Sequence, residues 1–155
     1  MWVERDFKQE KIAMSQMQRW TRKSILVGAF ALIAGCASMG GGDVAITMTG
    51  AEQVPPVKTA ASGSGSVRVG DDGAVSGRFR TQNIAPTAAH IHEAPAGQNG
   101  PVIVTLRKTG DNDWVVPDGA KFTPAQVASY KAGRLYVNFH TPANKGGEIR
   151  GQIRP

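Results

Sequence analysis

From residue 44 to the C-terminus, short β-type segments alternate with turn sequences, and few folds accommodate such a spacing. Residues 44–49 (VAITMT) alternate along the segment as a strand with one buried face does. Residues 64–69 and 74–82 flank Asp72-Gly73, a dipeptide typical of a tight hairpin turn. The pattern predicts an all-β sandwich or barrel with about seven to nine short strands.

The remaining strands are expected nearer the C-terminus, at residues 88–93, 102–107, 134–141 and 148–153. The segment 102–107 (VIVTLR) is apolar enough to be central in the sheet. Residues 53–57 contain two prolines, which donate no ladder hydrogen bonds, so this extended segment belongs on an edge. Arg78 and Arg80 lie on the wet face of their strand, where they could bind an anion or simply be solvated.

The register of the last two strands follows from their apolar residues. Apolar side chains stand opposite one another when Phe139 pairs with Ile149. The opposite face then carries a polar ladder of two cross-strand pairs, Asn138 with Arg150 and His140 with Glu148.

One short helix is expected at about 124–132. Thr123 is a suitable N-cap, Pro124 suits the first helical position and Gln126 completes a capping box. Gly133 then ends the helix, because glycine readily adopts the left-handed conformation of such an end.

The N-terminal residues 1–35 have the layout of a secretory signal peptide. Basic residues precede an apolar run of ten, Ile25–Ala34, which is too short to span a bilayer as a helix. A mixed-charge stretch comes before this layout, so we expect translation to start at Met14 or Met17.

The sequence Ile33-Ala34-Gly35-Cys36 resembles the bacterial lipobox. In such signals the peptidase cuts before the cysteine, and the thiol receives a diacylglyceryl group. The alternative is a plain signal peptide with an incidental cysteine. We expect Cys36 to anchor the chain to a membrane, with residues 36–43 as a flexible tether and 44–155 as the β domain. Alanine after the cysteine suggests the outer membrane, facing the periplasm or the cell surface.

The composition does not indicate nucleic-acid binding or an enzyme of a familiar motif class. The net charge is +6, but six of the 18 basic residues precede Cys36 and the others are scattered singly. A single cysteine excludes an internal disulfide and a multi-cysteine metal centre. The chain contains no G-x-S-x-G, P-loop or H-E-x-x-H motif, so no catalytic residue is assigned.

The three histidines are the most informative side chains. His90 and His92 project from the same face of one strand, and His140 lies on the polar face of another. If those strands are neighbours, the three imidazoles could hold one copper or zinc ion. Glu93 and Glu148 could orient the imidazoles from outside. The alternative is a set of hydrogen-bonded structural histidines.

Four parts of the chain resemble the CHRD domain, which is named after chordin. They are residues 49–63, 88–92, 97–106 and 136–153. The resemblance implies a Greek-key or immunoglobulin-like β domain in an extracytoplasmic protein that acts as an interaction module. It also implies a shared site or polar network, built from the three histidines, Asn138, Glu148 and Arg150. Gln53 and Lys145 depart from the family pattern, which often has glutamate and proline at these places.

The sequence His90-Ile91-His92-Glu93 is also similar to the copper strand of copper/zinc superoxide dismutase. The dinuclear site of that enzyme needs more histidines than the three in this chain, so a complete dinuclear dismutase is excluded. A relative with a single metal ion remains open.

These observations predict a lipid-anchored, non-enzymatic binding or structural module of the cell envelope. Its partner is an unidentified protein or glycan, and the three histidines are the candidate ligands of one metal ion. The alternative is a mononuclear copper or zinc enzyme with superoxide dismutase-like or other redox activity.

Overall fold

The computed structural model describes residues 42–155. The predicted signal peptide, the candidate start sites, Cys36 and most of the tether lie outside the described residues. None of the helices described is both long enough and apolar enough to cross a membrane.

The described chain contains nine strands, one α-helix and one short 3-10 helix. In chain order they are β1 (Val44–Thr49), η1 (Gly50–Glu52), β2 (Ser62–Val69), β3 (Val75–Gln82), β4 (Ala88–Glu93), β5 (Val102–Thr105), β6 (Arg107–Lys108), β7 (Asp113–Val115), α2 (Pro124–Lys131), β8 (Leu135–His140) and β9 (Ile149–Ile153). The prediction of an all-β fold with one short helix is confirmed.

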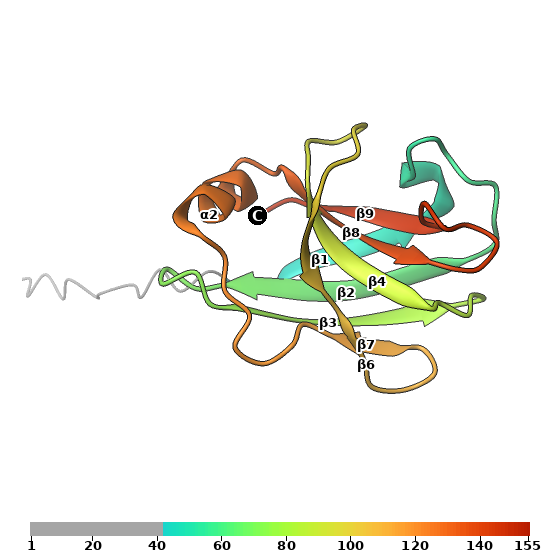
Figure 1. Cartoon of the computed structure of the whole chain (residues 1–155), viewed down its shortest axis with the longest axis horizontal. Coiled ribbons are helices and arrows are strands. Elements are labelled where there is room, and N and C mark those ends of the chain that lie inside the picture. The colour runs from blue at the N-terminus through green and yellow to red at the C-terminus, as the bar shows by residue number, and fades with distance from the viewer. Residues whose placement is uncertain (1–41) are drawn as a thin grey trace, which may run out of the picture. The chain divides into compact units, whose positions relative to one another are not determined.

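All the strand pairs are antiparallel, and the order across the sheet is β5-β4-β8-β9-β1-β2-β3-β7-β6. The two ends of this order are joined through Leu106, so one segment pairs first with β4 and then with β7. The sheet is therefore a nearly closed barrel. Figure 1 shows β8 and β9 above β2 and β3, with α2 at one end.

The core lies between the two sides of this barrel. Phe139 is fully buried, and its ring packs edge-on against Phe79 at 6.2 Å and against Trp114 at 5.7 Å between centroids. Tyr130 of α2 is buried with them. As predicted, the helix begins with a capping box formed by Thr123 and Gln126, and Gly133 follows it at a positive φ of 65°.

Two expectations about the strands are wrong. The segment from Val102 lies at the end of the strand order and not in its centre, and Val102 is 48% exposed. The reason is that this segment closes the barrel by changing partner, so each half is paired on one side. Residues 53–57 form no strand and follow η1 as a loop.

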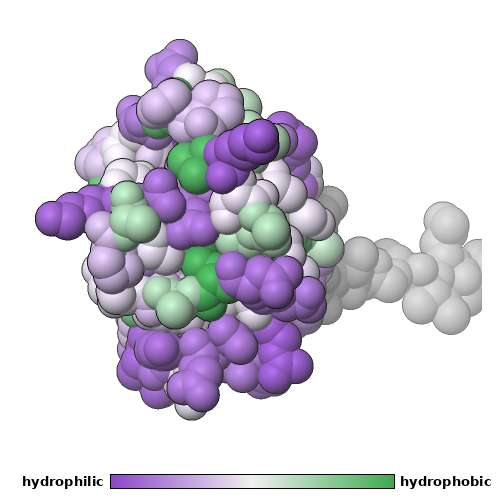
Figure 2. Space-filling model, turned by 90° about the vertical axis from the view of Figure 1, so that its right-hand side faces the viewer, coloured by the Kyte–Doolittle hydropathy of each residue, from purple (hydrophilic) through white to green (hydrophobic). Residues whose placement is uncertain are grey.

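The end of the domain opposite α2 faces the viewer in Figure 2. Its surface is mostly hydrophilic, and hydrophobic residues stand in small separate spots. This face therefore offers no broad apolar docking surface.

Candidate metal centre

The pairing of β4 with β8 brings the three histidines to one face of the sheet. Ala88 pairs with His140, His90 with Asn138, and His92 with Tyr136. Paired residues of an antiparallel ladder project to the same side. The predicted alternation is therefore confirmed, and the strands are neighbours, as the convergence of the imidazoles requires.

The imidazoles meet closely. His90 Nδ1 lies 2.9 Å from His140 Nε2. The ring centroid of His92 lies 5.6 Å from that of His90 and 6.2 Å from that of His140. One possible ligand atom from each histidine lies within 4.8 Å of the others. In a tetrahedral zinc site the ligand nitrogens are about 3.3 Å apart, so small side-chain rotations would bring these three to that spacing.

Two backbone carbonyl groups set which nitrogens face the centre. His92 Nδ1 donates to the carbonyl oxygen of Gly100 at 2.9 Å, and His140 Nδ1 donates to that of Lys145 at 2.9 Å. A carbonyl oxygen can only accept, so both Nδ1 atoms carry the proton and both Nε2 atoms carry a lone pair. A histidine that binds a metal commonly donates its other ring N–H in this way.

Two buried polar atoms at the centre have no hydrogen-bond partner among residues 42–155. They are His92 Nε2 and Asn138 Oδ1. Asn138 is 3% exposed, and its amide nitrogen donates to the carbonyl oxygen of Gly146 at 3.4 Å. Unpartnered buried polar atoms are uncommon and call for an explanation such as an ion or a water molecule. The donor set of three imidazole nitrogens fits a zinc or copper ion, and Asn138 lies beside it in the same row as His90.

Burial favours the neutral form of His90 and His92, which is the form that binds a metal. Burial, together with the neighbouring His140 and His92, lowers the pKa of His90 to about 4. Burial also lowers the pKa of His92, against the opposing effect of its hydrogen bond to Gly100. These two ligands therefore need not lose protons at neutral pH before a metal binds.

Tyr136 and Arg150 form a stack against one side of His92. The Tyr136 ring stacks on His92 with centroids 4.8 Å apart and planes at 7°. The Arg150 guanidinium carbon lies 3.5 Å from the centroid of the same ring. His92 and Arg150 come from strands on opposite sides of β8. The tyrosine therefore lies between a candidate ligand and a cation, and the cation lowers the pKa of His92 slightly.

Arg150 also holds the loop that supplies the Gly100 carbonyl. It is 1% exposed, and burial lowers its pKa. Its guanidinium donates to the carbonyl oxygens of Gln98 at 2.8 Å and Pro95 at 3.4 Å, and to Gln152 Oε1 at 3.0 Å. The predicted pairing of Arg150 with Asn138 is confirmed.

The two glutamates lie elsewhere. Glu93 follows His92 on the strand, so its side chain points away from that face, and it accepts a hydrogen bond from Ser129. The β8–β9 ladder ends at Phe139–Ile149, so the expected pairing of His140 with Glu148 is wrong. Glu148 accepts from Thr141 at 2.7 Å and from Thr59 and Asn144, and these bonds lower its pKa.

Sequence reasoning missed three contributors: Tyr136, Gly100 and Lys145. Alternation along β8 puts Tyr136 on the histidine face, so that signal was present. The two carbonyl groups have no side-chain signal. The structure does explain why residue 100 is a glycine, because a Cβ there would collide with the carbonyl oxygen of Glu93.

The model of one protein family, described as the CHRD domain, matches residues 44–153. The match runs from the first residue of β1 to the last residue of β9 and includes all three histidines. No curated protein and no solved structure matches the chain.

Proposed function

This chain belongs to the CHRD domain family, and we propose that it is a non-enzymatic binding module that holds one copper or zinc ion at His90, His92 and His140. The partner at the cell envelope is a protein or a glycan. The ion would supply positive charge and an open coordination position for a donor atom of that partner.

One observation carries the metal proposal. Two of the three imidazoles donate through Nδ1 to carbonyl oxygens, so their Nε2 lone pairs face the centre, and the third presents Nδ1 at 2.9 Å from one of these Nε2 atoms. Structural histidines that only bond to each other would need no such pair of carbonyl acceptors. The unpartnered atoms of His92 and Asn138 support the same interpretation.

A second candidate function is a mononuclear copper or zinc enzyme with redox or superoxide dismutase-like activity. The observation in its favour is that three protein ligands leave a coordination position open, as in catalytic zinc sites. A redox enzyme requires copper at this site, because zinc does not change oxidation state.

We further propose that Cys36 carries a lipid and tethers the domain to the membrane of the cell envelope. The support is the lipobox-like sequence before the only cysteine in the chain. The test is Cys36→Ser, which should move the exported protein from the membrane fraction to the soluble fraction. The N-terminal peptide should lose the mass of the diacylglyceryl group. An unchanged membrane fraction and an unmodified Cys36 peptide would contradict the anchor.

The metal proposal is tested by the metal content of the exported chain, purified without chelator or affinity tag. We expect about one copper or zinc ion per chain by elemental mass spectrometry. The His90→Ala/His92→Ala variant should contain none while keeping its β-type circular dichroism spectrum. Absence of metal from the wild type, even after incubation with both ions, would reduce the histidines to a structural network. Superoxide removal by the copper-loaded wild type, lost in this variant, would favour the enzyme.

A further inference from the structure

The outer face of β3 carries two arginines that differ in their surroundings. Arg80 donates to both carboxylate oxygens of Asp113, at 3.0 and 3.3 Å. Arg78 makes no ion pair with any carboxylate of residues 42–155. The two arginines that the sequence placed together on this wet face are therefore not equivalent, and only Arg78 has a guanidinium without an anion.

A second arginine, Arg107, lies two strands away in the same row and also makes no ion pair within the described residues. Arg78 pairs with Ser66 on β2 and with Val115 on β7, and Val115 pairs with Arg107 on β6. Paired residues project to the same side, and neighbouring strands are about 4.8 Å apart. The two arginines therefore flank Val115 with backbones about 10 Å apart, a gap that two such long side chains can close around one small anion.

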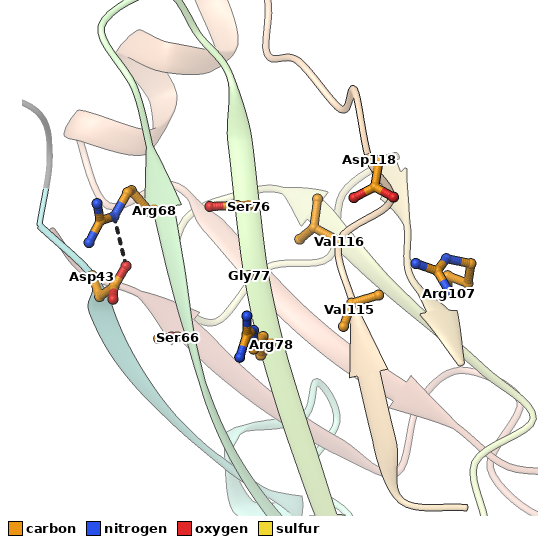
Figure 3. A pocket seen from close by; sticks show the side chains of 10 residues that line it. All are labelled: Asp43, Ser66, Arg68, Ser76, Gly77, Arg78, Arg107, Val115, Val116 and Asp118. Atoms are coloured by element: carbon orange, nitrogen blue, oxygen red, sulfur yellow. Dashed lines mark hydrogen bonds and ion pairs between the residues drawn. The ribbon is translucent and has the colours of Figure 1, made fainter. Parts of the chain in front are cut away.

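The row lies in a groove with a volume of about 640 Å³. Figure 3 shows Arg78 and Arg107 on either side of Val115, with the ion pair of Arg68 and Asp43 at the far wall. The hydroxyl groups of Ser66 and Ser76 also line this groove. Its size is within the range of small-molecule sites, and its floor is a sheet and not a mobile loop.

We propose that Arg78 and Arg107 form a binding site for a phosphate group. A guanidinium presents a planar fork of donors that matches phosphate oxygens, and a phosphate has enough oxygens and charge to accept from two arginines at once. This site is independent of the histidine centre, which β4 and β8 carry on another part of the barrel.

Two sources of phosphate have the required chemistry, a lipid headgroup and a soluble phosphate ester. The lipid source rests on the proposed anchor. Asp43 lines the groove, and the seven Cα-to-Cα steps from Cys36 to Asp43 reach at most about 25 Å, which keeps the groove near an anchoring bilayer. The phosphate site itself does not depend on the anchor.

Asp118 provides an internal check on the proposal. Its carboxylate lines the same groove and makes no ion pair within residues 42–155. It repels an anion bound nearby, so Asp118→Asn should tighten phosphate binding. A surface that attracts no anion would show no such gain.

The test is a titration of the full-length Cys36→Ser chain with inorganic phosphate at low salt, monitored by the chemical shifts of the backbone amides in NMR spectra. We expect shifts in the amides of Ser66, Arg78 and Val115. Arg78→Gln and Arg107→Gln should each weaken binding about fivefold, as the loss of one arginine near an anionic surface does. Arg80→Gln is the matched control, because it removes the same charge from the same strand but from an existing ion pair.

A second arm identifies the source. Vesicles of phosphatidylglycerol and of phosphatidylcholine are compared for binding of the same variants. The matched double control is Arg80→Gln/Lys121→Gln, because Lys121 lies in an ion pair with Asp72 at 3.9 Å. If Arg78→Gln/Arg107→Gln weakens binding to the anionic vesicles more than this control does, the phosphate is that of a lipid. Phosphate binding without this vesicle preference supports a soluble ester. Absence of phosphate shifts, or equal losses in the Arg78 and Arg80 variants, overturns the proposal.

Discussion

His140 Nε2 lies 2.9 Å from His90 Nδ1, although the two residues are 50 positions apart in the chain. Because the proton of His140 is committed to the Lys145 carbonyl at Nδ1, its Nε2 must accept in this contact. His90 therefore donates through Nδ1 when no metal is bound. To bind a metal through Nδ1, His90 must move its proton to Nε2, whereas His92 and His140 keep theirs.

Zinc binding is expected to change the tautomer of one histidine only. Addition of zinc should convert His90 from the Nδ1–H to the Nε2–H form, because Nδ1 becomes the ligand atom. The measurement is the ¹⁵N spectrum of the imidazoles with and without zinc. Retention of the Nδ1–H form of His90 in a zinc-bound protein would show that Nδ1 is not the ligand. Zinc should also raise the Tm of the wild type, by an amount that grows with free zinc.

Asn138→Ala is expected to weaken metal binding about tenfold, which is the usual loss when a group outside the ligands is removed. The reason is that Asn138 Oδ1 is buried beside the centre without a hydrogen-bond partner, where it can hold a metal-bound water molecule. The measurement is a competition titration with a chromophoric zinc chelator. Asn112→Ala, at an exposed asparagine, is the control and should leave the affinity unchanged. Equal affinities in all three proteins would remove Asn138 from the site.

Arg150→Met is expected to lower the free energy of unfolding by about 2–4 kcal/mol, because it leaves buried carbonyl groups without donors. The loop that carries Gly100 should also loosen, since Arg150 bonds to Gln98 and Pro95 within it. Urea denaturation measures the first effect, and zinc affinity measures the second. Arg154→Met removes the same charge from an exposed position and should change neither. A stable Arg150→Met protein with normal zinc affinity would contradict both statements.

Much of the fold could be predicted because the strands carry their own signals. Phe139 pairs with Ile149 and Asn138 with Arg150, as side-chain alternation requires. The edge position of Val102 could not be predicted, because it depends on where the barrel closes between β4 and β7. Local composition contains no such information.

The candidate site divides in the same way. Alternation put His90 and His92 on one face, and the β4–β8 pairing that brings in His140 is a long-range event. The side chain of Glu148 was misplaced because the turn before it, closed by hydrogen bonds between Thr141 and Asn144, ends the ladder early. The carbonyl groups that orient the imidazoles belong to the backbone, which a sequence pattern does not register.

The metal-free protein is expected to lose stability as the pH falls from about 6.5 towards 4. The pKa of His90 is about 4 in the folded state, against an ordinary value of 6.5. The unfolded chain therefore binds more protons in this interval, and stability rises with pH through it. Above pH 6.5, the ordinary pKa of the side chain, His90 is neutral in both states and no stability is lost through its protonation. The pKa of His92 is lowered too, so this residue adds to the same trend.

The measurement is urea denaturation of the chelator-treated protein at several pH values between 7 and 5. This interval lies above 4.5, the ordinary pKa of a glutamate such as Glu148. The pKa of Glu148 is lowered in the folded state, so stability is lost through its protonation only in more acidic solution. His90→Asn should flatten the pH dependence, because asparagine cannot gain a proton. A slope as steep in His90→Asn as in the wild type would mean that burial of His90 does not set the acid sensitivity of the domain.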